Sequence, residues 1–298
     1  MVMVRGAFSN TLAPGFRKVV FDTYKERPIE GKALVNQNTS KRAYEEDFQF
    51  VGFGTLRRKA EGSPVPYEDA RQGNTKRYLW DTWALGFRIT LEMMEDDLYS
   101  IVGGRLSKAL ARSARNNYEI IAHSPYNSAF DNTVNGFNSG EALCDTHSLI
   151  KGGTLRNRPV TDVDFSLPAL QAGLEHFHSL TDEAGMPVVY IPKTVVHSIG
   201  DYWMVNQTLK SPGLPGGNLN DINQVNREGL SPHLSHYLTD TDAWFILCDQ
   251  HDINFWERRA FTLSNSDDFK TKDAEFTGLA RRGVGWGDWR GIYGSAGE

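Results

Sequence analysis

Cysteine is scarce in this chain of 298 residues, and long apolar runs are absent. The two cysteines, Cys144 and Cys248, form neither a C-x-x-C pair nor a metal-binding spacing, so we expect two reduced, packed thiols. The longest apolar run, residues 243–248, is far shorter than the roughly 18 residues of a membrane-spanning helix. The first residues lack the apolar stretch of a secretory signal, so we expect assembly in a cytoplasm and no membrane partner.

The short motifs of common enzyme families are also missing. There is no phosphate-binding glycine loop, no dinucleotide-binding fingerprint, no H-E-x-x-H and no G-x-S-x-G. Two local clusters, Cys144-Asp-Thr-His147 and Asp249-Gln-His-Asp252, do combine nucleophile, carboxylate and imidazole groups. Such clusters arise by chance, whereas working sites usually draw their residues from distant segments. We therefore predict that Cys144, His147, Asp249 and His251 have no catalytic or metal-binding role, and we expect no cofactor.

Charge is distributed unevenly along the chain. Residues 1–60 hold 11 Lys and Arg against 6 Asp and Glu, whereas the remainder holds 21 against 31. A basic N-terminal part could bind nucleic acid, or it could dock on the acidic surface of a neighbouring subunit. Because the sequence pI is near 5.9 and no dense basic cluster is present, the pattern favours docking.

Residues 1–47 are predicted to form an extended arm. Prolines, glycines and the polar run of residues 36–40 interrupt every candidate helix. A segment of this kind cannot bury its few apolar side chains alone, so it is either disordered or held by a partner. We expect that residues 1–40 can be deleted while the fold is retained.

Two long strands are predicted at residues 48–59 and 75–91. The second strand places apolar side chains on one face at a period of two: Leu79, Trp83, Leu85, Phe87, Ile89 and Leu91. The connection at residues 60–74 contains two prolines and two glycines, which is typical of a wide, irregular tip. An isolated two-stranded ribbon is marginally stable in water, so this hairpin needs a partner surface.

The strongest helical pattern covers residues 92–122. Acidic side chains lie at its start, and Arg105, Lys108, Arg112 and Arg115 follow, which complements the helix macrodipole. Two adjacent glycines, Gly103 and Gly104, are costly inside a helix, so we expect a kink or a close packing contact there.

The C-terminal half alternates between helix and strand. Residues 123–165 are predicted to be a polar link, after which Ser166 is a plausible cap for a helix that ends before Gly185. A buried strand at 188–191 and a helix at 194–209 should follow. The strands predicted near the C-terminus are 233–238, 243–248, 255–263, 268–282 and 284–293, with turns at 264–267 and at Gly283. This alternation predicts an α+β fold.

The order of these parts is similar to the Hong Kong 97 fold of tailed-phage major capsid proteins, and more particularly to the major head subunits of Mu-like phages. The stretches that carry the resemblance are Arg77-Tyr-Leu-Trp80 through Glu92-Met-Met-Glu-Asp-Asp97, then Tyr237-Leu-Thr-Asp-Thr-Asp-Ala-Trp-Phe245, and Arg282-Gly-Val-Gly-Trp-Gly-Asp-Trp-Arg-Gly-Ile-Tyr-Gly294. The resemblance covers most of the chain and depends on the order of elements, because no single motif is diagnostic.

This resemblance implies a division into domains. Residues 1–47 would be the N-terminal arm, 48–91 the extended loop, 92–129 with 236–298 the peripheral domain, and 130–235 the axial domain. Residues 92–122 would form the spine helix of the peripheral domain. No long charged helical segment precedes the arm, so the resemblance implies that scaffolding is a separate protein or has been removed.

The resemblance also implies partners and a place of action. Such subunits form hexamers and pentamers that close an icosahedral shell around packaged double-stranded DNA, with separate scaffolding, portal and cement proteins as possible partners. The expected location is the virion capsid, assembled in the cytoplasm of a bacterial host. Two alternatives stay open: a hydrolase or transferase with its site in residues 130–250, and another phage structural protein of the tail or decoration type.

Two charge clusters have no evident partner within their own elements. In the family that the chain resembles, the extended loop of one subunit lies across the peripheral domain of the next subunit. We therefore expect ion pairs between subunits, each contributing about 0.2–1 kcal/mol. The basic cluster of the loop comprises Arg57, Arg58, Lys59, Arg71, Lys76 and Arg77, and the acidic cluster at the start of the helix comprises Glu92, Glu95, Asp96 and Asp97.

Overall fold

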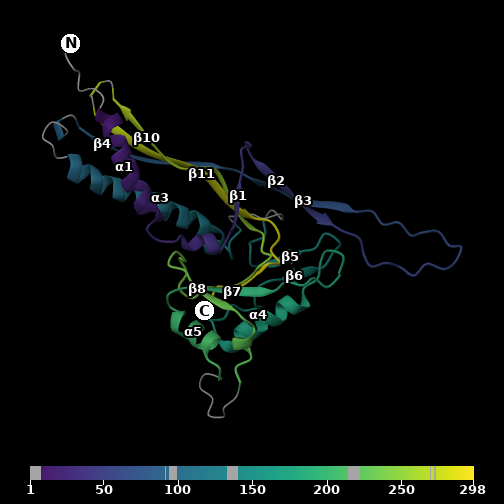
Figure 1. Cartoon of the computed structure of the whole chain (residues 1–298). Coiled ribbons are helices and arrows are strands. Elements are labelled where there is room, and N and C mark those ends of the chain that lie inside the picture. Colours follow the sequence, from purple (N-terminus) through teal and green to yellow (C-terminus); the bar gives the residue numbers. More distant parts are fainter. Residues whose placement is uncertain are drawn as a thin grey trace.

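A computed structural model of the chain describes residues 8–90, 92–93, 99–132, 140–213, 222–268, 270–271 and 273–298. Figure 1 shows two sheets with their helices, and a long ribbon that projects well beyond both. Among the described residues, no helix has the length and apolar character needed to cross a bilayer.

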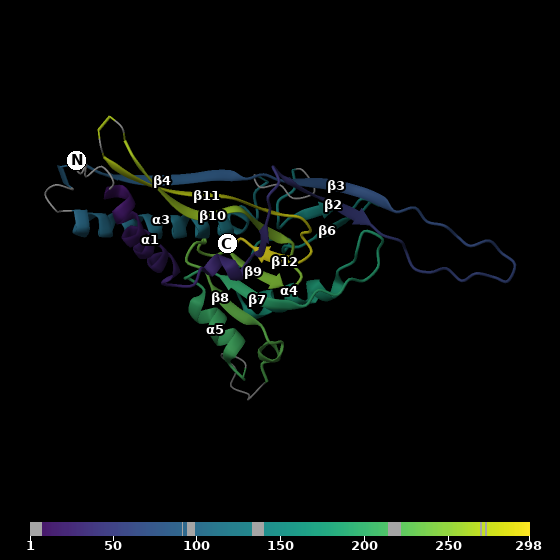
Figure 2. The same cartoon turned by 45° about the horizontal axis from the view of Figure 1, so that its top comes forward.

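The first sheet has four strands in the order β1-β10-β11-β4. The strands are β1 (Asn36–Thr39), β10 (Ile253–Asp267), β11 (Ala274–Trp286) and β4 (Asp81–Ile89). β1 runs parallel to β10, and the other neighbours are antiparallel. Helices α1 (Phe8–Lys25) and α3 (Tyr99–Asn127) pack against each other and lie on one face of this sheet (Figure 2).

The second sheet has the order β12-β9-β7-β8 and encloses the larger core. Its strands are β12 (Ile292–Ser295), β9 (Trp244–Cys248), β7 (Pro192–His197) and β8 (Ser231–Leu234). Helix α4 (Leu167–Ser179) packs on β9 and β12, where a Cβ added at Gly173 would lie 2.6 Å from Ile246. The remaining elements are α5 (Tyr202–Lys210), the 3-10 helices η1 (Glu30–Ala33) and η2 (Val225–Arg227), and the strands β5 (Thr146–Ser148) and β6 (Thr154–Arg156).

The extended ribbon consists of β2 (Glu45–Val51) and β3 (Arg71–Tyr78), which pair antiparallel. The prediction of one continuous strand over residues 75–91 is wrong, because the chain leaves the ribbon after Tyr78 and enters the first sheet at Asp81. The crossing is close: a Cβ added at Gly283 would lie 2.1 Å from the carbonyl oxygen of Leu79. A glycine in β11 therefore gives room for the chain to pass from the ribbon to the sheet.

The expectation of an arm without helix is also wrong. Residues 8–25 form α1, in which Pro14 is interior, and a proline in that position costs about 3 kcal/mol or more. Phe16 and Val20, one helical turn apart, are both buried between α3 and the first sheet. Burial of each such side chain contributes about 1.5–3 kcal/mol, so packing offsets the proline. Phe16, Val20, Leu34 and Val35 are thus part of the core, so deletion of residues 1–40 is now expected to disrupt the fold.

The contact predicted at the two adjacent glycines is confirmed at Gly103. A Cβ added there would lie 2.4 Å from the Phe16 ring, whereas a Cβ added at Gly104 would meet nothing within 4 Å. The helix continues to Asn127, with Pro125 near its end, so it ends five residues later than the predicted residue 122. Residues 94–98, at the predicted helix start, lie outside the described residues.

In the C-terminal half, Ser166 caps α4 as predicted, because its Oγ accepts from the amide of Ala169. The strand predicted at 188–191 is wrong, and so is the helix start at 194. Residues 188–191 have no regular structure, whereas residues 192–197 form β7 because Val195 and Val196 are fully buried in the sheet. The turns predicted at 264–267 and Gly283 both lie within strands, because β10 ends at Asp267 and its antiparallel neighbour β11 begins at Ala274.

The α1–α3 contact gives a stability test with a matched control. Gly103→Ala should lower the free energy of unfolding by about 1–3 kcal/mol, because the new methyl group would collide with Phe16. Gly104→Ala, one residue along, should be neutral or stabilising by up to about 1 kcal/mol, because alanine favours the helix and its methyl group finds open space. Denaturant unfolding measures both, and equal effects of the two substitutions would contradict the packing.

Candidate assembly surfaces

The tip of the ribbon carries apolar side chains that its own chain does not cover. Residues 52–70 connect β2 to β3 without strand structure. Leu56 is fully exposed and Tyr67 is 91% exposed, and Phe53 and Val65 are each more than half exposed. An exposed apolar patch of this kind marks an interaction surface.

A charged contact holds the two sides of the tip together. The Arg57 guanidinium lies 2.8 Å from Glu68 Oε1, and the amide of Gly54 donates to Glu68 Oε2 at 2.8 Å. The hydrogen bond from Gly54 and the nearby Arg57 charge lower the pKa of Glu68. The tip is therefore a shaped loop and presents its apolar side chains in a defined arrangement.

The base of the ribbon is tied to the second sheet by a buried ion pair. The Arg290 guanidinium lies 2.7 Å from Glu183, and both side chains are almost completely buried. Gln49 of β2 donates to the same Glu183 oxygen at 2.8 Å, and the amide of Ile150 donates to the other oxygen at 2.8 Å. Because removing one partner of a buried pair is strongly destabilising, this network fixes where the ribbon leaves the body.

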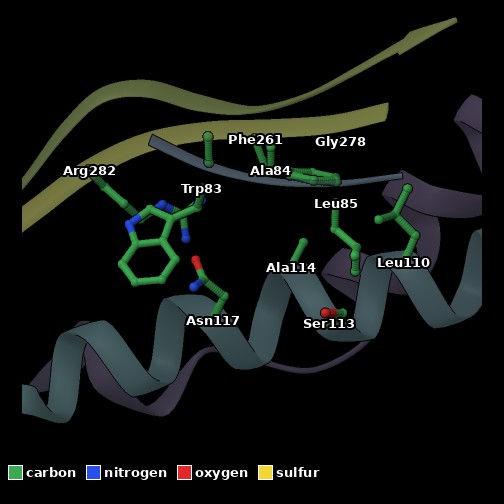
Figure 3. Close-up of a pocket in the computed structure, with 11 residues that line it drawn as sticks. Trp83, Ala84, Leu85, Leu110, Ser113, Ala114, Asn117, Phe261, Gly278 and Arg282 are labelled. Carbon is green, nitrogen blue, oxygen red and sulfur yellow. The ribbon is translucent and has the colours of Figure 1, made fainter. Parts of the chain in front are cut away.

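A second apolar surface lies in a groove between β4 and α3 (Figure 3). Trp83 and Leu85 of β4 point toward α3 across the groove, and Leu110 and Ala114 of α3 line the opposite wall. Trp83 is 40% exposed and Leu85 is 54% exposed, although the period-two pattern favoured a buried face there. Among the described residues of that face, Ile89 is buried and Phe87 is half-buried. The groove is therefore an apolar surface without a cover in the described chain.

The predicted absence of partners within the ribbon is wrong for two of the basic residues. Arg57 pairs with Glu68 across the tip, and Arg77 of β3 pairs with Glu46 of β2. Lys76 is partly buried, and burial lowers its pKa. Glu46 and Arg77 are directly opposite in the β2–β3 pair, and Arg57 and Glu68 meet across the connection between the two strands. Neither contact can be recognised from one element alone.

The other three cations of the cluster stay available. Arg58, Lys59 and Arg71 are exposed and make no ion pair with any residue in the described ranges. On the acidic side, Glu92 is exposed, whereas Glu95, Asp96 and Asp97 lie outside the described residues. The structure thus leaves the proposed pairing between subunits open for these groups.

The cluster at Cys144 and His147 is built into the core. The His147 ring stacks on Trp289 at 4.2 Å, its Nδ1 lies 3.1 Å from Glu141, and its Nε2 lies 3.2 Å from Asn157 Oδ1. Asn157 in turn donates to three backbone carbonyls, so its side chain joins distant segments. Cys144 is a free thiol, and complete burial raises its pKa far above the ordinary value. His147, Asn157 and Cys144 therefore contribute to the packing and hydrogen bonding of the core.

The side chains of the Asp249–Asp252 cluster make contacts in different places. Asp249 forms an exposed ion pair with Lys193 at 2.9 Å, whereas burial lowers the pKa of His251 to about 4. Asp252 accepts from the backbone amide of Asp288 at 2.8 Å. Within the described residues, no group of three or more His, Cys, Asp and Glu side chains could hold a metal ion. The predicted lack of a catalytic or metal role therefore stays a prediction, which metal analysis can test.

The sequence-based prediction missed the apolar character of the tip. It identified residues 60–74 as irregular from their prolines and glycines, but did not weigh Val65 and Tyr67 within them. Apolar side chains in a proline-rich loop were the available signal, because such loops are ordinarily polar. The groove could not be found, because it depends on how β4 and α3 approach each other.

Histidine burial predicts acid lability. Burial lowers the pKa of six of the eight histidines, to about 4 for His176 and His251; the six are His123, His147, His176, His197, His233 and His251. Because the unfolded chain has a histidine pKa near 6.5, it binds more protons than the folded chain below that pH. Stability should therefore be full above about pH 6.5 and fall progressively toward pH 4.

His176→Gln should weaken this pH dependence, because glutamine does not titrate, whereas the same change at His178, exposed on the same helix, should leave the dependence unchanged. Melting temperatures at pH 7 and pH 5 measure the effect. Equal pH dependence in the wild type and the His176 variant would contradict the burial argument.

The chain is similar to several known proteins. A family model described as phage capsid protein matches residues 73–295. The fold is similar to a chain of the procapsid of bacteriophage JBD30, with 16% sequence identity and a TM-score of 0.53, covering 99% of this chain and 77% of that one. The capsid of Myoviridae phage XM1 matches with 9% identity and a TM-score of 0.56, covering 90% and 92%.

A virus-like particle from Pyrococcus furiosus is also similar, with 9% identity and a TM-score of 0.55, covering 94% of this chain and 97% of that one. No curated protein matches the sequence. At these identities the structural likenesses establish the fold, whereas the family match rests on the sequence itself.

Proposed function

Because this chain belongs to the phage capsid protein family, we propose that it is the major head subunit of a tailed phage and closes with further copies into an icosahedral shell. The α+β class and the Hong Kong 97-like architecture predicted from sequence are confirmed. Family membership makes the chain a structural protein of a virus capsid, not an enzyme.

The observation that carries the assembly proposal is the uncovered apolar tip. The ribbon points away from the body in both views, so its tip does not reach the β4–α3 groove of its own chain (Figures 1 and 2). A surface on one end of a subunit that fits a different surface on another copy makes a head-to-tail contact, which forms a ring when the rotation between copies closes. The tip and the groove are two such different surfaces, and each lacks a cover.

Apolar burial should dominate this contact over ion pairs. Each buried apolar side chain contributes about 1.5–3 kcal/mol, whereas an exposed ion pair contributes about 0.2–1 kcal/mol. Leu56 and Tyr67 alone therefore outweigh several pairs between Arg58, Lys59 or Arg71 and the acidic helix start. The charges would serve mainly to set the register of the contact.

The finer parts of the proposal concern the assembly as a whole. The rings would be hexamers and pentamers, the cargo double-stranded DNA, and the place of assembly the cytoplasm of a bacterial host. Scaffolding, portal and cement proteins would be separate chains. We also propose the division of the chain into an arm, an extended loop, a peripheral domain and an axial domain. The same proposal includes the particular similarity to Mu-like phages.

Removing the apolar tip contacts should block assembly. The double substitution of Leu56→Ser and Tyr67→Ser should remove about 3–6 kcal/mol per contact, which raises the protein concentration needed for assembly about a hundredfold or more. Val160→Ser is the matched control, because Val160 is an exposed apolar residue remote from the ribbon in sequence. Electron micrographs should show shells or rings for the wild type and the control, and isolated subunits for the tip variant. Normal shells from the tip variant would refute the proposed contact.

Charge reversal tests the weaker ionic part. Reversing Arg58, Lys59 and Arg71 to Glu should impair assembly at low salt, because these cations have no ion pair among the described residues of their own chain. Reversing Glu95, Asp96 and Asp97 to Lys in the same chain should partly restore assembly. Light scattering follows both effects, and a reversed ribbon that assembles normally at low salt would remove the ion pairs from the proposal.

A further inference from the structure

One face of α3 carries a positive stripe that the assembly contacts leave unused. The exposed positions between residues 105 and 116 follow the helical period: Arg105, Lys108, Ala109, Arg112, Ser113 and Asn116. The three cations among them span about 10 Å along the helix axis. No Asp or Glu occurs from Tyr99 to Tyr118, so the stripe has no acidic neighbour on its own helix.

The stripe consists of cations that are unpaired within the described chain. Arg105, Lys108 and Arg112 make no ion pair or hydrogen bond with the described residues. Some other described cations do face a carboxylate; the ion-paired ones include Arg42, Arg57, Arg77, Arg88, Arg158, Lys193 and Arg290. A row of three exposed like charges with no acidic neighbour on its helix creates a local positive field that attracts a negatively charged partner.

The neighbouring side chains distinguish between two kinds of partner. Protein interfaces are anchored by aromatic and large apolar residues at their centre. The stripe has none between its cations, where the exposed residue is Ala109, and the polar Asn116 follows one turn after Arg112. Hydroxyl and amide side chains beside Arg and Lys are the groups that contact phosphate oxygens. The chemistry thus fits a phosphate backbone better than an acidic protein surface.

We propose that the face of α3 that carries Arg105, Lys108 and Arg112 contacts the phosphate backbone of double-stranded DNA. The inference rests on the proposed capsid function, which supplies the DNA as cargo, and it makes this face part of the inner surface of the shell. A duplex carries one negative charge per about 1.7 Å of its axis, so the stripe spans several phosphates. The contact is independent of base sequence, because an exposed stripe on a packed helix enters no groove.

The test compares two variants that lose the same charge. Replacing Arg105, Lys108 and Arg112 by Gln should weaken binding of a short labelled duplex to unassembled full-length subunits. Each lost phosphate contact lowers the salt dependence of log K by about 0.9, so the slope should fall by about 2.7. The control replaces Arg58, Lys59 and Arg71 by Gln and should keep the slope of the wild type. Because all six side chains are exposed, both variants should keep the wild-type melting temperature.

Other outcomes would overturn the proposal. An unchanged slope in the stripe variant would show that the stripe makes no phosphate contact, and an equal loss in the ribbon control would show that overall charge alone governs binding. Tighter binding of polyglutamate than of the duplex would identify an acidic protein as the partner. Duplex added to closed shells should stay unbound, and binding to their outside would place the stripe on the wrong surface. If no shells form, the capsid proposal fails. The binding comparison on unassembled subunits still shows whether the stripe contacts DNA.

Discussion

The subunit depends on a ribbon whose apolar side chains cannot be buried within one chain. A two-stranded ribbon is marginally stable alone, and this one projects its tip far from both cores. The side chains of Leu56 and Tyr67 are almost completely exposed to solvent, which is energetically unfavourable for apolar groups. Exposed apolar side chains of this kind are typical of an interaction surface. A second copy removes that cost wherever its surface offers an apolar groove, and the groove between β4 and α3 is such a surface. Burial of these exposed apolar side chains would thus be the driving force for association of two subunits.

The rest of the chain holds these two surfaces at a fixed separation. The buried Arg290–Glu183 pair and Gln49 set where the ribbon leaves the body. At the other end, α1 fills the space between α3 and the first sheet with Phe16 and Val20, which keeps the groove wall in place. Repeated contacts close into a regular shell only if every copy presents the same geometry, so rigid packing around both surfaces is as necessary as the surfaces themselves.

Sequence patterns predicted the elements whose signals are local. Ser166 caps α4 because the hydroxyl of a serine before an apolar helical pattern accepts a hydrogen bond from a free backbone amide of the first turn. Gly103 packs closely because a helix interior rarely contains glycine without a reason. By contrast, α1 was missed because Pro14 argues against a helix, and only tertiary burial outweighs that preference. The exposure of Trp83 and Leu85 was missed for the same reason: alternation shows that a face is apolar, not which element covers it.

The central claim is that a neighbouring copy covers the ribbon tip. Hydroxyl-radical footprinting of Phe53 and Tyr67 tests it most directly, because aromatic rings react in proportion to their exposure. Both rings should react strongly in unassembled subunits, where more than half of each is exposed. In closed shells both rings should be strongly protected, with exposed Trp203 of α5 as an internal reference in the same sample. Equal modification of Tyr67 in subunits and in shells would contradict it.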